Sequence, residues 1–598
     1  MTGQASLELG VTGNCVVSAL VDRQARVVWS CFPRLDGDPV FHALVDRTDQ
    51  PGARGFWSVE LGGFERSEQE YIGNTAVLRT RLYSSNGSAV EVIDFCPRFE
   101  RLGRMFRPQM LVRRVRPLAG TPRICVRLRP SFNYGAVAPA ITHGSNHIRY
   151  VSEDRVLRLT TDAPVSYVLA ETPFLLESDI SLVLGADETL SDGADAMARA
   201  FQEATEDHWR RWSRRLAIPA EWQDAVIRAA ITLKLCQFEE TGAIVAAMTT
   251  SIPEAPASGR NWDYRYCWLR DAFFVVRALN SLSEVDTMEH YLRYLGNIVG
   301  QATDGHLQPV YGIALERRLD EREAPALSGY RGMGPVRVGN QAFEHHQHDV
   351  YGNVVLATAQ SFFDRRLLRA ATEQDFLRLE RVGEQAWRVY ATPDAGMWEL
   401  RTRERIHTSS ALMCWAACDR LARIATHRGL QERARHWDAR AAEIRQAIES
   451  RAFDAARGSF MESFGGNDVE AGLLLMAETG FLPPGDARFA GTVALVEQRL
   501  RRGRHLFRYA AADDFGQPTT AFNICTFWYI DALARVGRRE EARELFEHML
   551  AARNHLGLLS EDIAPDSGEH WGNYPQTYSL VGIVNAAMRL SRGWEAFT

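Results

Sequence analysis

From residue 220 to its end, the chain repeats the apolar spacing of an α-helix in about twelve separate segments. The loops that run from an even-numbered segment to the next odd one are mostly brief, whereas those from odd to even are mostly long. Twelve antiparallel helices that close on themselves form an (α/α)6 barrel, so we predict this fold for residues 220–598. The predicted helices lie at roughly residues 221–240, 270–282, 285–300, 350–364, 373–392, 409–428, 432–453, 468–478, 492–502, 522–536, 539–553 and 577–591.

The long loops of such a barrel all emerge at the same end. This geometry predicts that residues 241–269, 301–349, 393–408, 503–521 and 554–576 surround one mouth. The same loops hold most of the Gly, Trp, His and carboxylate residues that could carry chemistry, and chance would not sort them so cleanly. We therefore expect the functional site at this mouth.

The first 190 residues show a different pattern, in which short runs rich in β-branched residues are separated by turn signals such as Ser85-Asn86-Gly87. Many short strands at this spacing predict an antiparallel β-sandwich over residues 1–190. Residues 191–219 are predicted to be a helical linker. The fold class is therefore mainly α, with a β-sandwich before the barrel. The predicted strands are Cys15–Leu20, Arg26–Cys31, Ala76–Tyr83, Ala89–Phe95, Met110–Val115, Ile124–Leu128, Val156–Thr160 and Ser166–Leu169.

Composition excludes several classes of function. A net charge of −6 argues against nucleic-acid and anionic-membrane partners. Lys234 is the only lysine and no GxxxxGK[ST] loop occurs, so P-loop and Schiff-base chemistry are disfavoured. The nine cysteines include no Cys-x-x-Cys pair, and we predict neither a metal nor a cofactor. Because the N-terminus does not resemble a signal peptide and no run of about 18 apolar residues occurs, we expect a cytoplasmic protein with no membrane association.

Two carboxylates in these loops are suited to splitting a glycosidic bond. Glu399 follows Gly396-Met397-Trp398, and Glu561 lies in Leu559-Ser560-Glu561-Asp562. Hydrolysis of a glycoside needs one carboxyl group to protonate the leaving oxygen and a second to activate water or attack the sugar. The alternative is that both are ordinary surface acids, as most of the 75 Asp and Glu residues must be.

The stretch from Arg260 to Asp271 opens the second predicted helix with the sequence RNWDYRYCWLRD. Its aromatic rings could stack on the CH faces of a sugar, while its arginines and aspartates could bind hydroxyl groups. The alternative is a structural Arg–Asp pair with packed aromatic rings. The composition favours a sugar site.

Two further groups are less specific. His345, His346 and His348 could bind a metal, but three close histidines are more often hydrogen-bonding pocket residues. Arg508-Tyr509, followed by Asp513-Asp514, offers another polar edge of the mouth, or a solvated loop.

Three blocks in order carry a resemblance to a known family: RNWDYRYCWLRDA at 260–272, GMWELR at 396–401 and LLSEDIAPDSGEHWGNYPQTYSL at 558–580. They resemble the signature blocks of the glucoamylase-type family 15 of the glycoside hydrolases. Residues 13–34 also resemble the N-terminal β-domain of its bacterial members. The resemblance implies a β-sandwich joined to an (α/α)6 barrel. It also implies exo-acting hydrolysis of α-glucosides with inversion at the anomeric carbon.

Carried over by motif, the resemblance implies that Glu399 is the general acid and Glu561 the general base. Arg270 and Asp271 would bind hydroxyls of the terminal glucose. The other residues implied to contact the sugar are Tyr264, Trp268, Trp398 and Arg508. The sequence departs from the family at His345, His346, His348, residues 515–520 and Leu580, and we expect these positions at the mouth.

We therefore predict an exo-acting, inverting hydrolase of a small α-glucoside, which could be a malto-oligosaccharide, an isomaltose-type glucoside or trehalose. One alternative is a non-catalytic glycan sensor on the same barrel. Another is a polysaccharide lyase centred on the three histidines, which would need several unpaired arginines for its uronic-acid substrate. No feature of the sequence predicts an oligomeric state.

Overall fold

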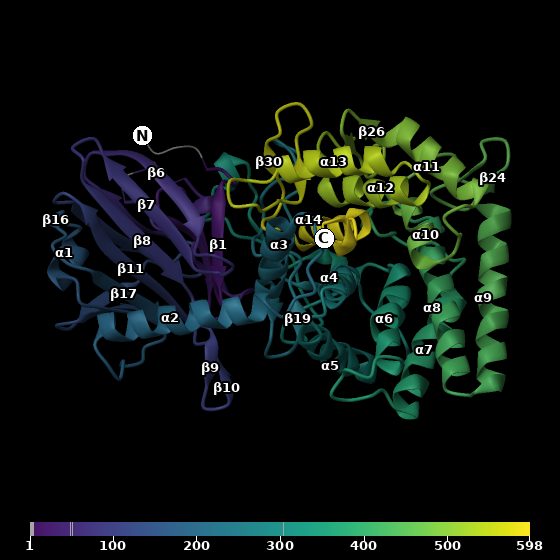
Figure 1. The fold of residues 1–598 in the computed structure, drawn as a ribbon, viewed down its shortest axis with the longest axis horizontal. Helices are drawn as coiled ribbons and strands as arrows, with labels where there is room; N and C mark the ends of the chain where they lie inside the picture. Colours follow the sequence, from purple (N-terminus) through teal and green to yellow (C-terminus); the bar gives the residue numbers. More distant parts are fainter. Residues whose placement is uncertain (1–4, 48–49, 51, 303, 598) are drawn as a thin grey trace.

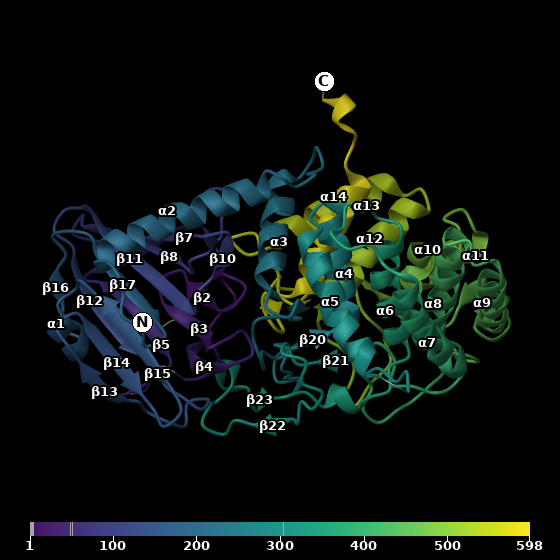
Figure 2. The same ribbon diagram turned by 90° about the horizontal axis from the view of Figure 1, so that it is seen from below.

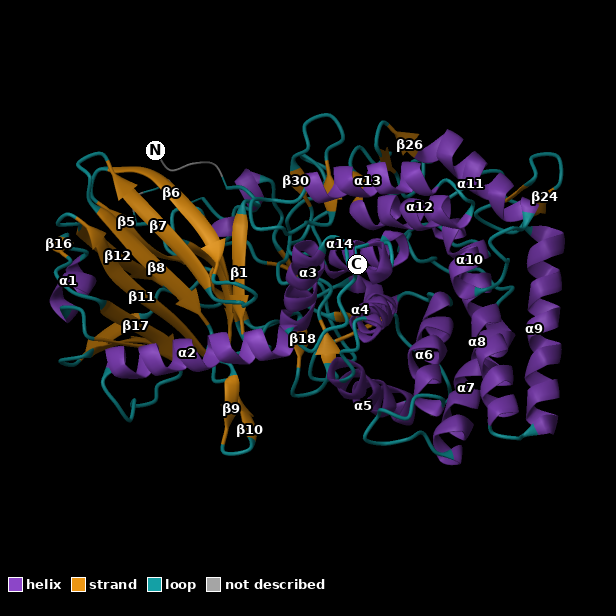
Figure 3. Cartoon of the chain, viewed as in Figure 1, coloured by secondary structure: helices purple, strands orange, loops and turns teal. Residues whose placement is uncertain are grey.

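The computed structural model describes residues 5–47, 50, 52–302 and 304–597, and it has two parts (Figure 1). Strands fill the N-terminal part and helices the C-terminal part (Figure 3). This arrangement confirms the predicted fold class. None of the helices in the described ranges has the length and apolar content needed to cross a bilayer.

The N-terminal part is a sandwich of two antiparallel sheets that pack face to face. Trp29 and Trp57 are fully buried in its core. One sheet, in the order β1-β2-β3-β5-β12-β16 with β4 beside β3, consists of β1 (Leu9–Gly13), β2 (Ser18–Asp22), β3 (Val27–Phe32), β4 (Asp38–Phe41), β5 (Phe56–Leu61), β12 (Arg123–Arg129) and β16 (Phe174–Leu175). The other sheet, in spatial order, consists of β13 (Ala140–His143), β14 (His147–Val151), β15 (Val156–Thr161), β17 (Ile180–Gly185), β11 (Met110–Ala119), β8 (Ala89–Phe95), β7 (Leu78–Ser84) and β6 (Phe64–Tyr71).

One predicted strand is wrong. Ser166–Leu169 lies within a short helix, α1 (Val165–Ala170), which begins after Pro164 and packs on β12. Val165 and Val168 are buried at helical spacing, whereas a strand would bury alternate residues. A short apolar run does not distinguish the two structures, and proline at the start of a helix fits its fixed φ angle. The other seven predicted strands overlap observed ones.

A single long helix, α2 (Ala194–Ser213), connects the two parts. It packs along the sheet that contains β17 and leads to the first barrel helix (Figures 1 and 2). It lies inside the predicted linker, while the boundaries predicted at residues 190 and 219 remain predictions.

Each of the twelve predicted barrel helices overlaps a helical segment of the described chain. The eighth begins as a 3-10 helix, η5 (Ala471–Leu475). The α-helices are α3 (Gln223–Leu235), α4 (Leu269–Ser281), α5 (Asp286–Gln301), α6 (Asp349–Ala359), α7 (Glu373–Val389), α8 (Thr408–His427), α9 (Gln431–Arg451), α10 (Met476–Thr479), α11 (Ala487–Leu500), α12 (Asn523–Arg535), α13 (Arg539–Ala551) and α14 (Thr577–Leu590).

The second, fourth, sixth, eighth, tenth and twelfth of these segments form the closed inner wall of the barrel. Each of these segments contacts the next in the order α4, α6, α8, η5, α12 and α14, and α14 contacts α4 again. The remaining helices lie outside this ring. All long loops therefore leave at one end, where three short strands form a small sheet: β28 (Ala521–Phe522), β29 (Asp562–Ile563) and β30 (His570–Trp571).

The sandwich supports the barrel loop that precedes α4. Arg265 and Asp263 form a fully buried ion pair, with Nη2 to Oδ2 at 2.7 Å. The same guanidinium donates to the Gly37 carbonyl at 2.7 Å and to the Tyr134 hydroxyl at 3.0 Å, both in the sandwich. The Trp29 indole donates to the Met248 carbonyl at 2.7 Å.

A second buried cluster joins the two parts beside α3. Arg98 of the sandwich donates to Glu239 at 2.6 Å. The Lys234 ammonium lies 3.0 Å from the same carboxylate and 3.6 Å from Glu284. Only 2% of the Lys234 side chain is exposed. Buried charges are tolerated only when they are paired in this way, so the contact between the two parts depends on complementary ions as well as on apolar packing.

Candidate active site

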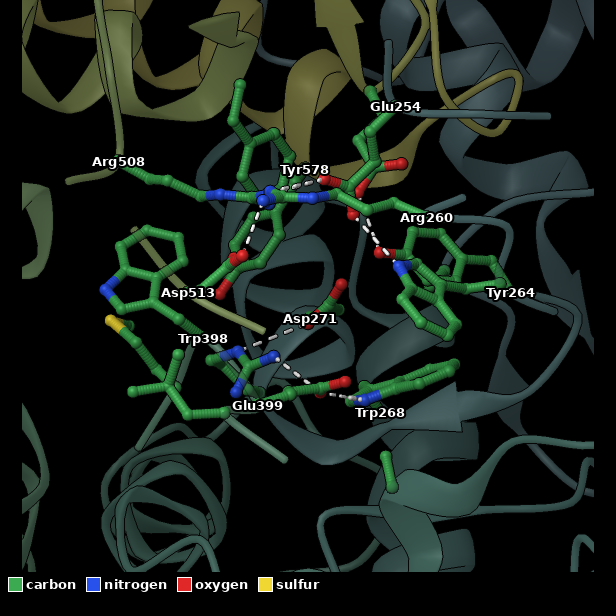
Figure 4. Close-up of a pocket in the computed structure, with 18 of the residues that line it drawn as sticks. Glu254, Arg260, Tyr264, Trp268, Asp271, Trp398, Glu399, Arg508, Asp513 and Tyr578 are labelled. Carbon is green, nitrogen blue, oxygen red and sulfur yellow. Dashed lines mark hydrogen bonds and ion pairs between the residues drawn. The ribbon is translucent and has the colours of Figure 1, made fainter. Parts of the chain in front are cut away.

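A pocket opens at the end of the barrel where the long loops leave (Figure 4). The structure brings all eight of the predicted site residues to its wall, although they come from four separate segments of the chain. They are Tyr264, Trp268, Arg270, Asp271, Trp398, Glu399, Arg508 and Glu561.

Glu399 lies half-buried in this wall. The Trp268 indole donates to its Oε1 atom at 2.6 Å, and the Arg270 guanidinium lies 3.4 Å from the same oxygen (Figure 4). Its backbone is left-handed, with φ of 60°, which is uncommon for a residue with a side chain. Gly396 in the same turn has φ of 66°, and a Cβ atom there would lie 2.8 Å from the His407 ring. Strained turns of this kind concentrate at functional sites.

Trp398 points to a different carboxylate. Its indole donates to Oε2 of Glu470 at 2.6 Å, and its ring packs against Tyr509 and Trp528. Glu470 is buried, and burial raises its pKa to about 7. The sequence reasoning missed Glu470. The available signal was an acid in the apolar run Val469-Glu470-Ala471-Gly472-Leu473, where an unpaired charge is costly.

Glu561 is the most deeply buried of the predicted acids, with 1% of its surface exposed. The Tyr264 hydroxyl donates to its Oε1 atom at 2.7 Å, and the backbone N–H of Asn573 lies 3.4 Å from Oε2. Gly572 has φ of 74°, and a Cβ atom there would lie 2.6 Å from the glutamate side chain. The loop therefore needs glycine at this position to pass so close to the carboxylate.

Burial and neighbouring negative charges raise the pKa of Glu561 well above its usual range. Burial is the largest cause, and Glu254 and Asp562 add to it. Burial and Glu254 also raise the pKa of Asp562 to about 8. Interacting acids of this kind release their protons in coupled steps. At neutral pH, the cluster therefore holds at least one proton.

Glu254 was not singled out in the sequence. It is buried at the pocket wall, where Arg508 donates to its Oε2 atom at 2.5 Å and the Trp262 indole to Oε1 at 3.1 Å (Figure 4). Arg260 lies 3.6 Å away. Its loop, Pro253-Glu254-Ala255-Pro256, offered no chemical pattern, because its importance arises only from the arginines that the fold brings to it.

Arg270 and Asp271 lie deeper, at the start of α4. The guanidinium contacts Asp271 at 3.5 Å and Asp349 at 3.6 Å, and it donates to the Gln347 side chain at 3.1 Å. Asp271 is 6% exposed, and no described residue forms a hydrogen bond with its Oδ1 atom, the oxygen that lies 3.5 Å from Arg270. Burial raises its pKa to about 7. A buried oxygen without a donor can accept a hydrogen bond from a ligand hydroxyl.

The three predicted histidines do not converge on one point. Only His345 lines the pocket. The His346 ring packs edge-on against His306, with centroids 5.3 Å apart, and the backbone N–H of His348 donates to Asp394 at 2.7 Å. In the part of the chain that the structure describes, no group of three or more His, Cys, Asp or Glu side chains could hold a metal ion.

Every arginine at the pocket wall has a carboxylate partner within 4 Å. Arg260 contacts Asp513, Arg270 contacts Asp349, Arg401 contacts Glu321 and Arg508 contacts Glu254. A lyase for uronic acids would need unpaired arginines to bind the substrate carboxylate, so the pocket favours a neutral sugar.

Two carboxylates that line one pocket beside aromatic rings meet the chemical needs of glycosidic-bond hydrolysis. The model of the glycosyl hydrolases family 15 matches residues 221–588, and that of the trehalase-like N-terminal domain matches residues 7–171. The chain belongs to glycosyl hydrolase family 15.

Curated relatives are similar over nearly the whole chain. The trehalase of Mycobacterium tuberculosis is 31% identical, with 97% of this chain and 88% of that protein covered. The trehalase of Thermoplasma volcanium is 29% identical, with 97% of this chain and 93% of that protein covered. A bacterial glucoamylase solved in complex with acarbose is 12% identical, covers 98% of this chain and 94% of its own, and has a TM-score of 0.68, which shows the same fold.

Proposed function

We propose that this α-glucoside hydrolase is a trehalase that acts with inversion of configuration. The observation that carries the proposal is the end-to-end similarity to curated trehalases, since both the sandwich and the barrel are matched. The pocket supports it, because it combines two carboxylates with a buried Arg270–Asp271 pair that is suited to binding sugar hydroxyls. Nine buried cysteines, none in a disulfide, suit a reducing compartment such as the cytoplasm.

In the proposed reaction, Arg270 and Asp271 hold the hydroxyls of one glucose unit at the buried end of the pocket. Glu399 gives its proton to the glycosidic oxygen, and the bond from that oxygen to the anomeric carbon breaks. A water molecule attacks the same carbon from the opposite face, and Glu561 takes its proton. The products are two glucose molecules, and both carboxyl groups then exchange protons with solvent.

The surroundings of Glu561 support its role as the base. Donation from the Tyr264 hydroxyl stabilises the ionised form, and so does the nearby charge of Arg508. Glu561 and Asp562 titrate as interacting groups, so in the proposed mechanism the retained proton resides on Asp562 when Glu561 acts as the base. The raised pKa values keep Glu561 a stronger base than an exposed glutamate.

Glucose release should be fastest from trehalose. A screen of trehalose, maltose, isomaltose and kojibiose should give the highest kcat/KM for trehalose, since its two glucose units present α-linked rings to the same hydroxyl-binding end. A higher kcat/KM for maltose or isomaltose would refute the trehalase assignment while leaving an α-glucoside hydrolase.

The stereochemistry of the first products tests the mechanism. Inversion at one anomeric carbon of trehalose should yield one β-glucose and one α-glucose in equal amounts, before mutarotation. Early proton NMR spectra at high enzyme concentration distinguish them. Release of α-glucose alone would show retention, which a carboxyl separation near 5 Å permits and one of about 6.5–9.5 Å does not.

Glu399→Gln and Glu561→Gln should each lower kcat by at least about a thousandfold, because neither amide can transfer the required proton. Sugar binding, measured by calorimetry, should persist within a few-fold. Glu404→Gln is a matched control, since Glu404 is an exposed acid five residues beyond Glu399. Normal turnover by either of the first two variants would remove that residue from the mechanism.

Replacement of Glu254 should change the pH dependence of kcat/KM. Its negative charge contributes to the raised pKa of Glu561, so Glu254→Gln should lower that pKa and move the acid limb of the profile down by about one pH unit. Glu404→Gln is the matched control. Because this exposed acid is not among the groups that raise the pKa of Glu561, its replacement should leave the acid limb in place. An unchanged limb in Glu254→Gln would contradict the assignment of Glu561 as base.

A further inference from the structure

Residues 512–516, here called the strap, lie across the outer rim of the pocket. They belong to the loop between β27 (His505–Leu506) and β28, and Asp513 and Gly516 pair through their backbones to form a tight turn. Asp513, Asp514 and Phe515 line the pocket. Phe515 is 38% exposed, whereas Asp271 in the same pocket is buried, so the strap is the outer wall and the Arg270–Asp271 pair the inner one.

One side of the strap is anchored to the loop that carries Tyr264. Arg260 donates to Oδ1 of Asp513 at 2.6 Å and to the Gly516 carbonyl at 2.8 Å (Figure 4). The Phe515 and Trp262 rings meet edge to face, with centroids 5.3 Å apart. Arg260 is 4% exposed, so this ion pair is shielded from solvent and from salt.

The other side of the strap is anchored to the loop that carries Glu399. The backbone N–H of Arg401 donates to Oδ2 of Asp514 at 2.7 Å, and the Thr402 hydroxyl donates to the same carboxylate. Arg403 donates to the Ala512 carbonyl. The strap thus ties together the two loops that hold the candidate acid and the tyrosine partner of the candidate base.

The two loops that anchor the strap also contact each other directly. The Arg401 guanidinium lies over the Trp262 ring, 4.2 Å from its centroid, and pairs with Glu321 at 3.0 Å. A sugar chain extending out of the pocket past this rim would have to separate several charge-assisted hydrogen bonds, each stronger than a neutral one. A disaccharide needs no such opening if its second ring fits beneath the strap.

We propose that the strap limits the leaving-group side of the pocket to a single sugar ring, so that the site selects disaccharides over longer α-glucans. The proposal rests on the proposed function in that the ligand is an α-glucoside. Asp513 and Asp514 determine this limit by holding the strap closed, and Phe515 supplies its apolar underside.

The test compares maltose with maltotriose, which share one linkage and differ by one ring. The wild-type kcat/KM for maltotriose should be at least tenfold below that for maltose. In the Asp513→Ala/Asp514→Ala/Phe515→Ala variant, the ratio of maltotriose to maltose should rise at least tenfold. Asp454→Ala, which breaks an exposed ion pair with Arg457 away from the pocket, is the matched control and should leave the ratio unchanged.

Asp514→Asn serves as a second variant if the triple variant does not fold, because it keeps the size of the side chain and weakens only one anchor. It should shift the ratio in the same direction by about threefold or more. Wild-type cleavage of maltotriose as efficient as that of maltose, or an unchanged ratio in the folded variants, would overturn the proposal.

Measurements of sugar binding distinguish a failure of this proposal from a failure of the proposed function. Calorimetry with Glu399→Gln should show tighter binding of maltose than of maltotriose, and removal of the strap contacts should abolish that difference. If the wild-type protein releases no glucose from any α-glucoside, the proposed function fails, and these two dissociation constants still decide whether the strap excludes a third ring.

Discussion

The buried Arg265–Asp263 ion pair is the interaction on which the geometry of the site depends. Both side chains are fully buried, and the cost of removing two charges from water is offset only because the guanidinium also donates to Gly37 and Tyr134 of the sandwich. The pair lies at the centre of the segment that presents Tyr264 and Trp268 to the pocket. The sandwich is therefore a structural part of the candidate site, although the residues proposed to act on the sugar belong to the barrel.

The charges around the pocket follow from the same constraint. Glu254, Glu561 and Asp562 are buried close to one another, and the nearby Arg508 and Arg260 are both paired, the first with Glu254 and the second with Asp513. This arrangement has more carboxyl groups than arginines, so some of the carboxyl groups must bind protons. The raised pKa values of Glu561 and Asp562 agree with this. A site built in this way can keep one carboxyl group protonated beside an ionised one, which is what proton transfer in both directions requires.

The sequence predicted those parts of the protein that depend on local pattern. The twelve helices were found because each buries one face at a regular period. Seven of the eight pocket residues were found because they stand in recognisable blocks, and Arg508 because its loop was expected at the same mouth. It did not predict Glu254, Glu470 or the turn of the strap, because each acquires its role from residues more than 70 positions away in the chain. The same limit explains the error at α1, where six residues are too few to reveal a period.

The burial of Lys234 has a consequence for how this protein can be probed. Its ammonium group is enclosed by Glu239 and Glu284 where Arg98 of the sandwich meets the barrel, and no other lysine occurs in the sequence. Reagents that acylate lysine side chains therefore find none at the surface of the intact fold. The group becomes reactive only when the fold around it opens, so this side chain is a built-in reporter of local unfolding beside the contact between the sandwich and the barrel.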